Sequence, residues 1–247
     1  MEMTFIFALV AIVFLASVIH GSISIGFGMI STPLVALFTD MQTAITYMLI
    51  PTMLVNAFSV INEGKFLEAL RKFWLIIFLM IIGSIMGTVL LVYTNSDYFK
   101  LLLALIIFIY LIQSAVKIEA TFISKYPKSS TYGLGIIGGI ISGLTNVVAP
   151  LVLIYTLELK YTKKDIVQLS NLCFLFSKMS QLVVFLSLGA FSIQAFKISA
   201  ISIFIVFIGL FFGIKIKNKI DKKFYTKILN ALLFLIATIL VFDTINL

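Results

Sequence analysis

A lysine deep inside an apolar block is the residue of this sequence best suited to chemistry. Lys178 lies thirteen residues beyond Asp165, or ~20 Å along a helix. A cation at that depth in a bilayer costs ~2.5–3.5 kcal/mol, so it should face a cavity or a partner. Gln168, Asn171 and Gln181 follow the spacing of one helical face with it. This stripe predicts a polar pathway along which a buried cation attracts an anion.

A structural role for Lys178 is the alternative, and it would require a carboxylate partner. The acidic residues lie in or near the connectors between apolar blocks, and Asp243 lies near the end of the last block. Because ionisable residues inside membranes are generally functional, we favour a pathway role and leave the structural one open. The second apolar block carries a matching polar set, Thr52, Asn56 and Ser59.

Two glycine-rich segments could hold negative charge in a second way. Residues 21–35 and 138–152 each place glycines before a proline inside an apolar block, and both residue types interrupt helices. The N-terminus of a half-helix presents free N–H groups and the positive end of its dipole. We expect structural breaks at Gly21, Pro33, Gly143 and Pro150. The predicted substrate-binding residues are Lys178, Ser22, Ser24, Gly26, Gly28, Thr145, Asn146, Asn171, Asn56 and Gln181.

Nucleophilic or metal-dependent catalysis finds little support in the sequence. His20 is the only histidine and Cys173 the only cysteine, so neither a Ser/His/Asp set nor a metal cluster of ordinary spacing can be assembled. We therefore expect no enzyme activity, no cofactor and no metal site.

Composition places the chain in a membrane. Of its residues 62% are apolar and only 11% charged, with a mean hydropathy of +1.19, far from the averages of soluble domains. Eight apolar blocks are separated by short connectors, and most blocks approach the ~20 residues needed to span a bilayer as a helix. The net charge of +8 lies mainly in the connectors, which indicates membrane orientation and not nucleic-acid binding. We expect an all-α integral membrane protein.

An internal repeat relates the two halves. Residues 21–35 and 138–152 align without gaps at an offset of 117, with six of fifteen positions identical. Gly83 and Gly87 in the first half, like Gly209 and Gly213 in the second, form GxxxG pairs suited to close helix packing. The sequence predicts a single membrane domain, 1–247, with repeat one at about 1–117 and repeat two at about 131–247.

The distribution of basic residues indicates how the blocks cross. Fifteen Lys and Arg lie in connectors 62–72, 117–130, 158–165 and 215–227, whereas the termini and the remaining connectors hold two. The positive-inside rule then favours two blocks that enter and leave by one face, each followed by three spanning helices. Three is odd, so the two repeats would be inverted. Both termini would be extracytoplasmic in an inner membrane; eight ordinary spans with kinks are the alternative.

The two glycine-proline segments resemble those of the TauE/SafE family of membrane permeases, described as sulfite or organosulfonate exporters. Residues that fit the two family motifs are Gly21, Gly26, Gly28, Pro33 and Leu34, and then Gly139, Gly143, Leu144, Thr145, Pro150 and Tyr155. The chain departs from the family pattern at Phe27 and at 146–149, where glycines are common in the family. The resemblance implies transport of sulfite, sulfoacetate and similar anions.

We therefore expect a permease of small anions, with substrate held near the midplane between the two broken segments. The alternative is a non-transporting membrane scaffold or accessory subunit, whose glycines and polar stripes only pack helices. The expected partners are a small anion and the lipid bilayer, with no nucleic acid.

Overall fold

The structure is a computed structural model that describes residues 3–116, 120–217 and 222–245, and within these ranges it is helical. Six of its helices, α1, α3, α4, α5, α9 and α10, are long and apolar enough to cross a membrane. This confirms the predicted all-α membrane class. The helices are α1 (Met3–Ile23), α2 (Phe27–Ala36), α3 (Met41–Glu63), α4 (Phe66–Tyr93), α5 (Tyr98–Val116), α6 (Thr121–Lys125), α7 (Pro127–Thr145), α8 (Ala149–Glu158), α9 (Lys163–Ser187), α10 (Ile193–Ile216) and α11 (Lys222–Ile245).

The outer surface of the helices suits lipid. Large apolar side chains such as Phe7, Trp74 and Phe204 are 68%, 60% and 74% exposed, and a surface of this kind would associate in water. Hydrocarbon solvates these side chains, while the helices satisfy their own backbone groups. The chain is a multi-pass membrane protein.

Three long helices begin at side-chain caps that the sequence supplies locally. Asp40, Thr162 and Ser192 accept backbone N–H groups at the starts of α3, α9 and α10. Burial acts to raise the pKa of Asp40, but hydrogen bonds from Thr43 and Ser96 outweigh it, so this pKa lies below its ordinary value.

Two apolar blocks are each divided into a long and a short helix. In the first of these broken blocks α1 and α2 are separated by residues 24–26, the first break. In the other broken block α7 and α8 are separated by residues 146–148, the second break. Ser24 and Asn146, which follow α1 and α7, both have left-handed backbone conformations, with φ of 65° and 60°. Gly26 at the N-cap of α2 has φ 107°, a conformation natural to glycine.

The breaks do not lie at the four residues expected to make them. Gly21 lies inside α1 and Gly143 inside α7, where each glycine lets another helix approach. A Cβ added at Gly21 would lie 2.9 Å from the Leu210 carbonyl oxygen of α10. A Cβ added at Gly143 would lie 2.6 Å from the Ser84 carbonyl oxygen of α4. Pro33 lies within α2, and Pro150 lies in the first turn of α8, where its missing N–H is not needed.

Corresponding helices of the two halves are spaced differently from the sequence match. α2 and α8 begin 122 residues apart, as do α3 and α9, whereas the best ungapped sequence match has an offset of 117. The match pairs Gly26, which lies in the first break, with Gly143, which packs inside α7, so it does not superimpose the breaks. At the spacing of 122, Asn56 corresponds to Lys178 and Ser59 to Gln181.

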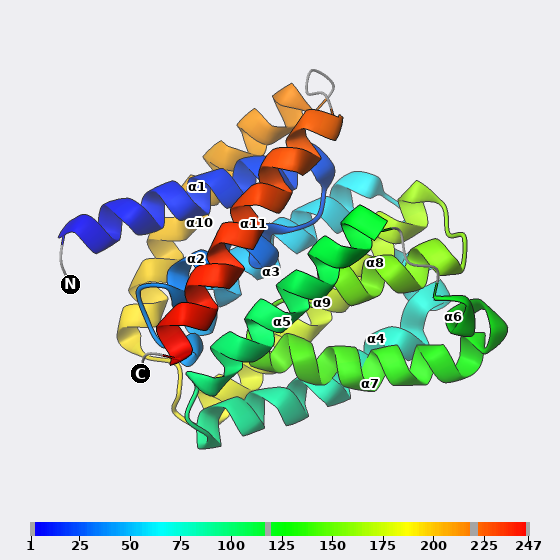
Figure 1. The fold of residues 1–247 in the computed structure, drawn as a ribbon, viewed down its shortest axis with the longest axis horizontal. Coiled ribbons are helices and arrows are strands. Elements are labelled where there is room, and N and C mark those ends of the chain that lie inside the picture. Colours follow the sequence, from blue (N-terminus) through cyan, green and yellow to red (C-terminus); the bar gives the residue numbers. More distant parts are fainter. Residues whose placement is uncertain (1–2, 117–119, 218–221, 246–247) are drawn as a thin grey trace.

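Each broken block folds back on itself. Phe5 near the start of α1 packs on Phe38, just beyond α2, with ring centroids 6.3 Å apart. Thr131 in the first turns of α7 shares a 2.8 Å hydrogen bond with Tyr155 near the end of α8. In Figure 1, α2 runs back toward the end of the molecule where α1 begins, and the last turns of α11 lie at that same end.

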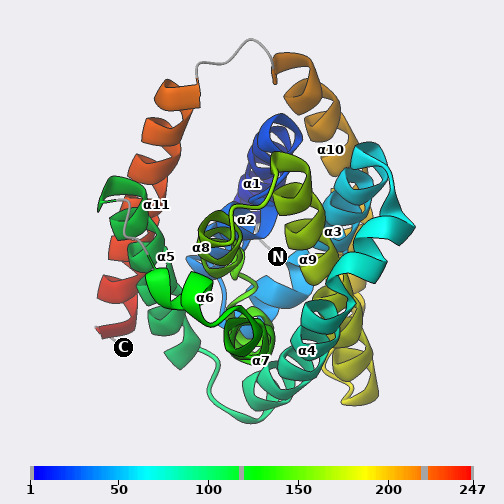
Figure 2. The ribbon, with the colours of Figure 1, turned by 90° about the vertical axis from the view of Figure 1, so that its right-hand side faces the viewer.

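The long helices pair across the two halves through the glycines. Gly83 and Gly87 of α4 pack against the backbone of α7, and Gly209 and Gly213 of α10 pack against that of α1. This confirms the predicted GxxxG packing. The short helices α2 and α8 are interior, between the α5–α11 pair and the other long helices (Figure 2).

Candidate functional site

A small cavity lies where the N-termini of the two short helices meet. Its free space is about that of one water molecule, so the site is closed in this conformation. Helices α2 and α8 form two walls, α3 forms a third, and α9 contributes one aromatic ring. The lining residues are Gly26, Phe27, Gly28, Met29, Thr52, Asn56, Val147, Ala149 and Phe174.

Neither short helix is capped by the side chain of its own N-cap residue. Gly26 and Val148, the N-cap residues of α2 and α8, make no side-chain cap hydrogen bond. The first-turn N–H groups of a helix have no partner within it, and the dipole gives that end about half a positive charge. Two such ends facing one cavity favour an anion there.

The wall formed by α3 adds neutral hydrogen-bonding groups. Thr52 Oγ1 donates to the Met48 carbonyl over 2.6 Å, and Asn56 Nδ2 donates to the Thr52 carbonyl over 2.6 Å. The amide of Asn56 has a second N–H, so it can donate to a ligand without losing the bond to its own helix. Both side chains are at least 95% buried.

The two breaks contact each other directly. Asn146 Nδ2 donates to Thr32 Oγ1 on α2 over 2.6 Å. At Gly28 an added Cβ would lie 2.9 Å from the Asn146 carbonyl oxygen, so only glycine allows this approach. Within the described residues, the buried Oδ1 of Asn146 has no hydrogen-bond partner.

Lys178 holds the C-terminal end of α7. Its fully buried Nζ donates to the Ser142 carbonyl over 2.8 Å and to Gln181 Oε1 over 2.7 Å. Gln181 Nε2 in turn donates to the Gly143 carbonyl over 2.8 Å. These carbonyls belong to the last turn of α7, the negative end of its dipole. None of the ion pairs among the described residues involves Lys178, and it does not line the cavity.

The other two polar residues of the α9 stripe, Gln168 and Asn171, donate hydrogen bonds to backbone carbonyl oxygens that lie beyond helix ends. Asn171 Nδ2 donates to the Ser24 carbonyl in the first break over 2.8 Å. Gln168 Nε2 donates to the Gly64 carbonyl, just beyond α3, over 2.5 Å. One face of α9 therefore fixes both breaks. The sequence predicted the stripe but not that its targets are carbonyl oxygens.

Two of the remaining predicted site residues make hydrogen bonds within their own helices, and a third contacts a distant lysine. Ser22 Oγ donates to the Ile19 carbonyl over 2.7 Å, and Thr145 Oγ1 donates to the Ile141 carbonyl over 2.8 Å. Ser24 Oγ lies 3.5 Å from Lys217 Nζ. Of the ten predicted residues, the structure brings Gly26, Gly28 and Asn56 to the cavity.

His20 is a positioning residue that sequence reasoning did not select. Its Nδ1 accepts the backbone N–H of Phe27, the first residue of α2, over 3.4 Å, and its Nε2 lies 2.8 Å from Ser59 Oγ. The ring therefore ties the start of α2 to α3.

The chain was also compared with known proteins. A family model described as "Sulfite exporter TauE/SafE" matches residues 9–240. Neither the curated proteins nor the solved structures gave a match.

Proposed function

The chain belongs to the TauE/SafE sulfite exporter family, a family of membrane transporters, and on that premise we propose that it carries sulfur oxyanions or organosulfonates, such as sulfite or sulfoacetate, across an inner membrane. The substrate would be held near the midplane, between the two broken segments.

The observation that carries this proposal is the cavity shared by the N-termini of α2 and α8. Each helix end contributes ~0.3–1 kcal/mol toward an anion at an exposed site and up to ~2 kcal/mol when partly buried. Asn56 supplies a neutral donor beside them, whereas the hydroxyl proton of Thr52 is already donated to the Met48 carbonyl. These groups bind an oxyanion without adding a charge of their own that would have to be desolvated. A scaffold protein has no need of two helix N-termini that face one space.

We include Lys178 in the proposed site because it binds the last turn of α7, next to the second break. Two of its three N–H groups serve Ser142 and Gln181, which leaves one for an anion that reaches this break. Its charge also offsets the negative end of α7 beside the cavity. We propose that Asn171 and Gln181 act with it by holding the two breaks in place.

Two inverted repeats are the architecture we propose for this permease. The packing supports it, because α4 lies along α7 while α10 lies along α1, and α3 contacts α10 while α9 contacts α4. If α1, α3 and α4 are exchanged with α7, α9 and α10, the α4–α7 contact becomes the α10–α1 contact, and the α3–α10 contact becomes the α9–α4 contact. The basic connectors 62–72, 117–130, 158–165 and 215–227 hold fifteen Lys and Arg against two elsewhere outside the blocks, so we assign them to the cytoplasm and both termini to the other side.

Flux into proteoliposomes tests the proposal. Purified protein should take up radiolabelled sulfite or a short sulfonate faster than protein-free liposomes, and excess unlabelled anion should compete. Sulfate and chloride in the same panel measure selectivity. If no anion of the panel is bound or carried by folded protein, the accessory-subunit alternative replaces this function.

A further inference from the structure

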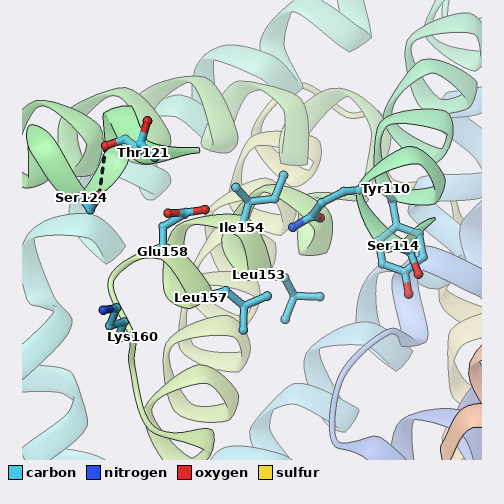
Figure 3. A pocket seen from close by; sticks show the side chains of 10 residues that line it. Tyr110, Ser114, Thr121, Ser124, Leu153, Ile154, Leu157, Glu158 and Lys160 are labelled. Carbon is cyan, nitrogen blue, oxygen red and sulfur yellow. Dashed lines mark hydrogen bonds between the residues drawn. The ribbon is translucent and has the colours of Figure 1, made fainter. Parts of the chain in front are cut away.

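A second and much larger cavity opens beside α8. It has a volume of about 800 Å³ and is separate from the closed cavity at the helix N-termini. Figure 3 shows its walls: Tyr110 and Ser114 come from α5, Ser124 from α6, and Ile154 and Leu157 from α8. None of these residues belongs to the site described above.

The position of this cavity along α8 connects it to the closed site. Ala149, in the first turn of α8, lines the closed cavity, and Leu153 lines the large one. The two residues are four positions apart on the helix, a rise of ~6 Å. A single turn of α8 is therefore all that divides the two spaces along this helix.

The chemistry of the large cavity suits water and a passing ion. Polar groups come from three helices, including Ser114 and Gln113 on α5 and Thr121 on α6. Ser114 Oγ accepts a 2.9 Å hydrogen bond from Asn230, which ties this wall to α11. An apolar cavity open to the surface would bind lipid chains, whereas hydroxyl and amide groups are hydrated.

Four of the lining residues, Thr121, Ser124, Glu158 and Lys160, belong to two connectors that carry an excess of basic residues. Glu158 is engaged by the backbone N–H of Ala120 over 2.6 Å, and Lys160 stands beside it in the lining. The described residues of these connectors, 120–130 and 158–165, hold five Lys against two acidic residues, Glu158 and Asp165, so their net charge is +3. Positive charge at a mouth raises the local concentration of anions and their rate of arrival.

We propose that this cavity is the water-filled cytoplasmic vestibule of the anion pathway, and that the turn of α8 from Ala149 to Leu153 is the barrier between it and the closed site. The occupant is the transported anion with part of its hydration shell, so the inference rests on the proposed function. α5 lines the vestibule and packs against α8, so movement of α8 relative to α5 would open the barrier.

Thiol labelling tests whether the vestibule holds water. Tyr110→Cys places a thiol in the cavity wall, and Ile109→Cys places one on the neighbouring residue, which is 40% exposed and outside the lining. Both are made in a Cys173→Ala background, because Cys173 is the only native thiol. A charged, membrane-impermeant methanethiosulfonate applied from the cytoplasmic side should label position 110 about tenfold faster, since thiolates form in water and not in lipid.

Flux measured after labelling tests whether the vestibule lies on the pathway. A bulky label on Ile154→Cys should lower sulfite uptake about tenfold, whereas Ile109→Cys treated with a membrane-permeant form of the label should keep its flux. Equal labelling at positions 109 and 110, or full flux after complete labelling at 154, would overturn the inference while leaving the proposed function intact. Lack of flux in the unlabelled background protein would overturn the proposed function, and labelling would still decide whether the vestibule exists.

Discussion

Asn146 donates its side-chain amide to the hydroxyl of Thr32 over 2.6 Å, and this bond joins the second break to the short helix of the first broken block. The two residues are 114 positions apart in the chain but lie beside the same closed cavity. Any movement that separates α2 from α8 must break this bond. Its strength therefore bears on both stability and transport.

Thr32→Val should destabilise the protein and alter transport. The substitution keeps the side-chain shape but leaves the buried amide of Asn146 without its acceptor, which costs ~1–3 kcal/mol. Thr238→Val is the matched control, because the Thr238 hydroxyl bonds only to the Phe234 carbonyl of its own helix. Thermal unfolding in detergent and sulfite flux measure the two effects. Equal behaviour of the two variants would show that the bond between the breaks is unimportant.

Asn56→Ala should weaken anion binding. It removes an amide donor from the wall of the closed cavity, and the loss of a hydrogen bond to a charged group is ~1.5–3 kcal/mol, or roughly 10- to 150-fold in Kd. Asn95→Ala, at an exposed position before α5, controls for loss of an asparagine. Titration of sulfite against folded protein gives the result. An unchanged Kd for Asn56→Ala would remove α3 from the site.

Lys178→Met should lower anion affinity roughly 5- to 150-fold, the equivalent of ~1–3 kcal/mol. The change removes the charge and keeps the apolar stem, while Lys178→Arg keeps the charge with different donor geometry and should retain part of the function. Lys197→Met, at an exposed position of α10, removes one charge away from the site.

The Lys178 variants also separate the two roles of this residue. If Lys178→Met unfolds more easily but binds and carries anions as well as the wild type, then Lys178 only holds the end of α7 through Ser142. The site would then consist of the N-termini of α2 and α8 with Asn56.

Gly139→Ala and Gly133→Ala on α7 should have opposite effects on stability. At Gly139 a Cβ would lie 2.6 Å from the Met80 carbonyl oxygen of α4, whereas at Gly133 no atom of the described residues lies within 4 Å. The first substitution forces α4 and α7 apart, and the second gains ~0.5–1 kcal/mol of helix propensity. Melting temperatures in one detergent compare them. A stabilised Gly139→Ala protein would contradict the close packing.

Single cysteines at Ser124 and Thr162, both exposed, should be labelled from the same cytoplasmic face. Asn95→Cys should be labelled only from the opposite face. The measurement uses an impermeant reagent on intact cells and on inverted vesicles, in the Cys173→Ala background. Labelling of positions 124 and 162 from opposite faces would mean that the second broken block crosses the membrane fully, which the inverted-repeat proposal does not allow.

The sequence by itself determined the features that depend on local periodicity. Apolar length and composition decide which segments belong in lipid, so the membrane class followed without structure. The helical spacing of Gln168, Asn171, Lys178 and Gln181 placed them on one face of α9, and GxxxG spacing located the close helix contacts. These properties are set within a few turns of a helix.

Only the tertiary structure decided what those faces meet. A glycine in an apolar block either breaks a helix or admits a neighbour, and Gly21 and Gly143 admit α10 and α4. The partner of Lys178 is a carbonyl 36 residues away, and the closed cavity joins residues of α2, α3, α8 and α9. Freed backbone carbonyls and N–H groups are the same for every residue type, so no pattern of side chains marks where they will lie. Their positions follow from the packing of helices that are distant in the chain.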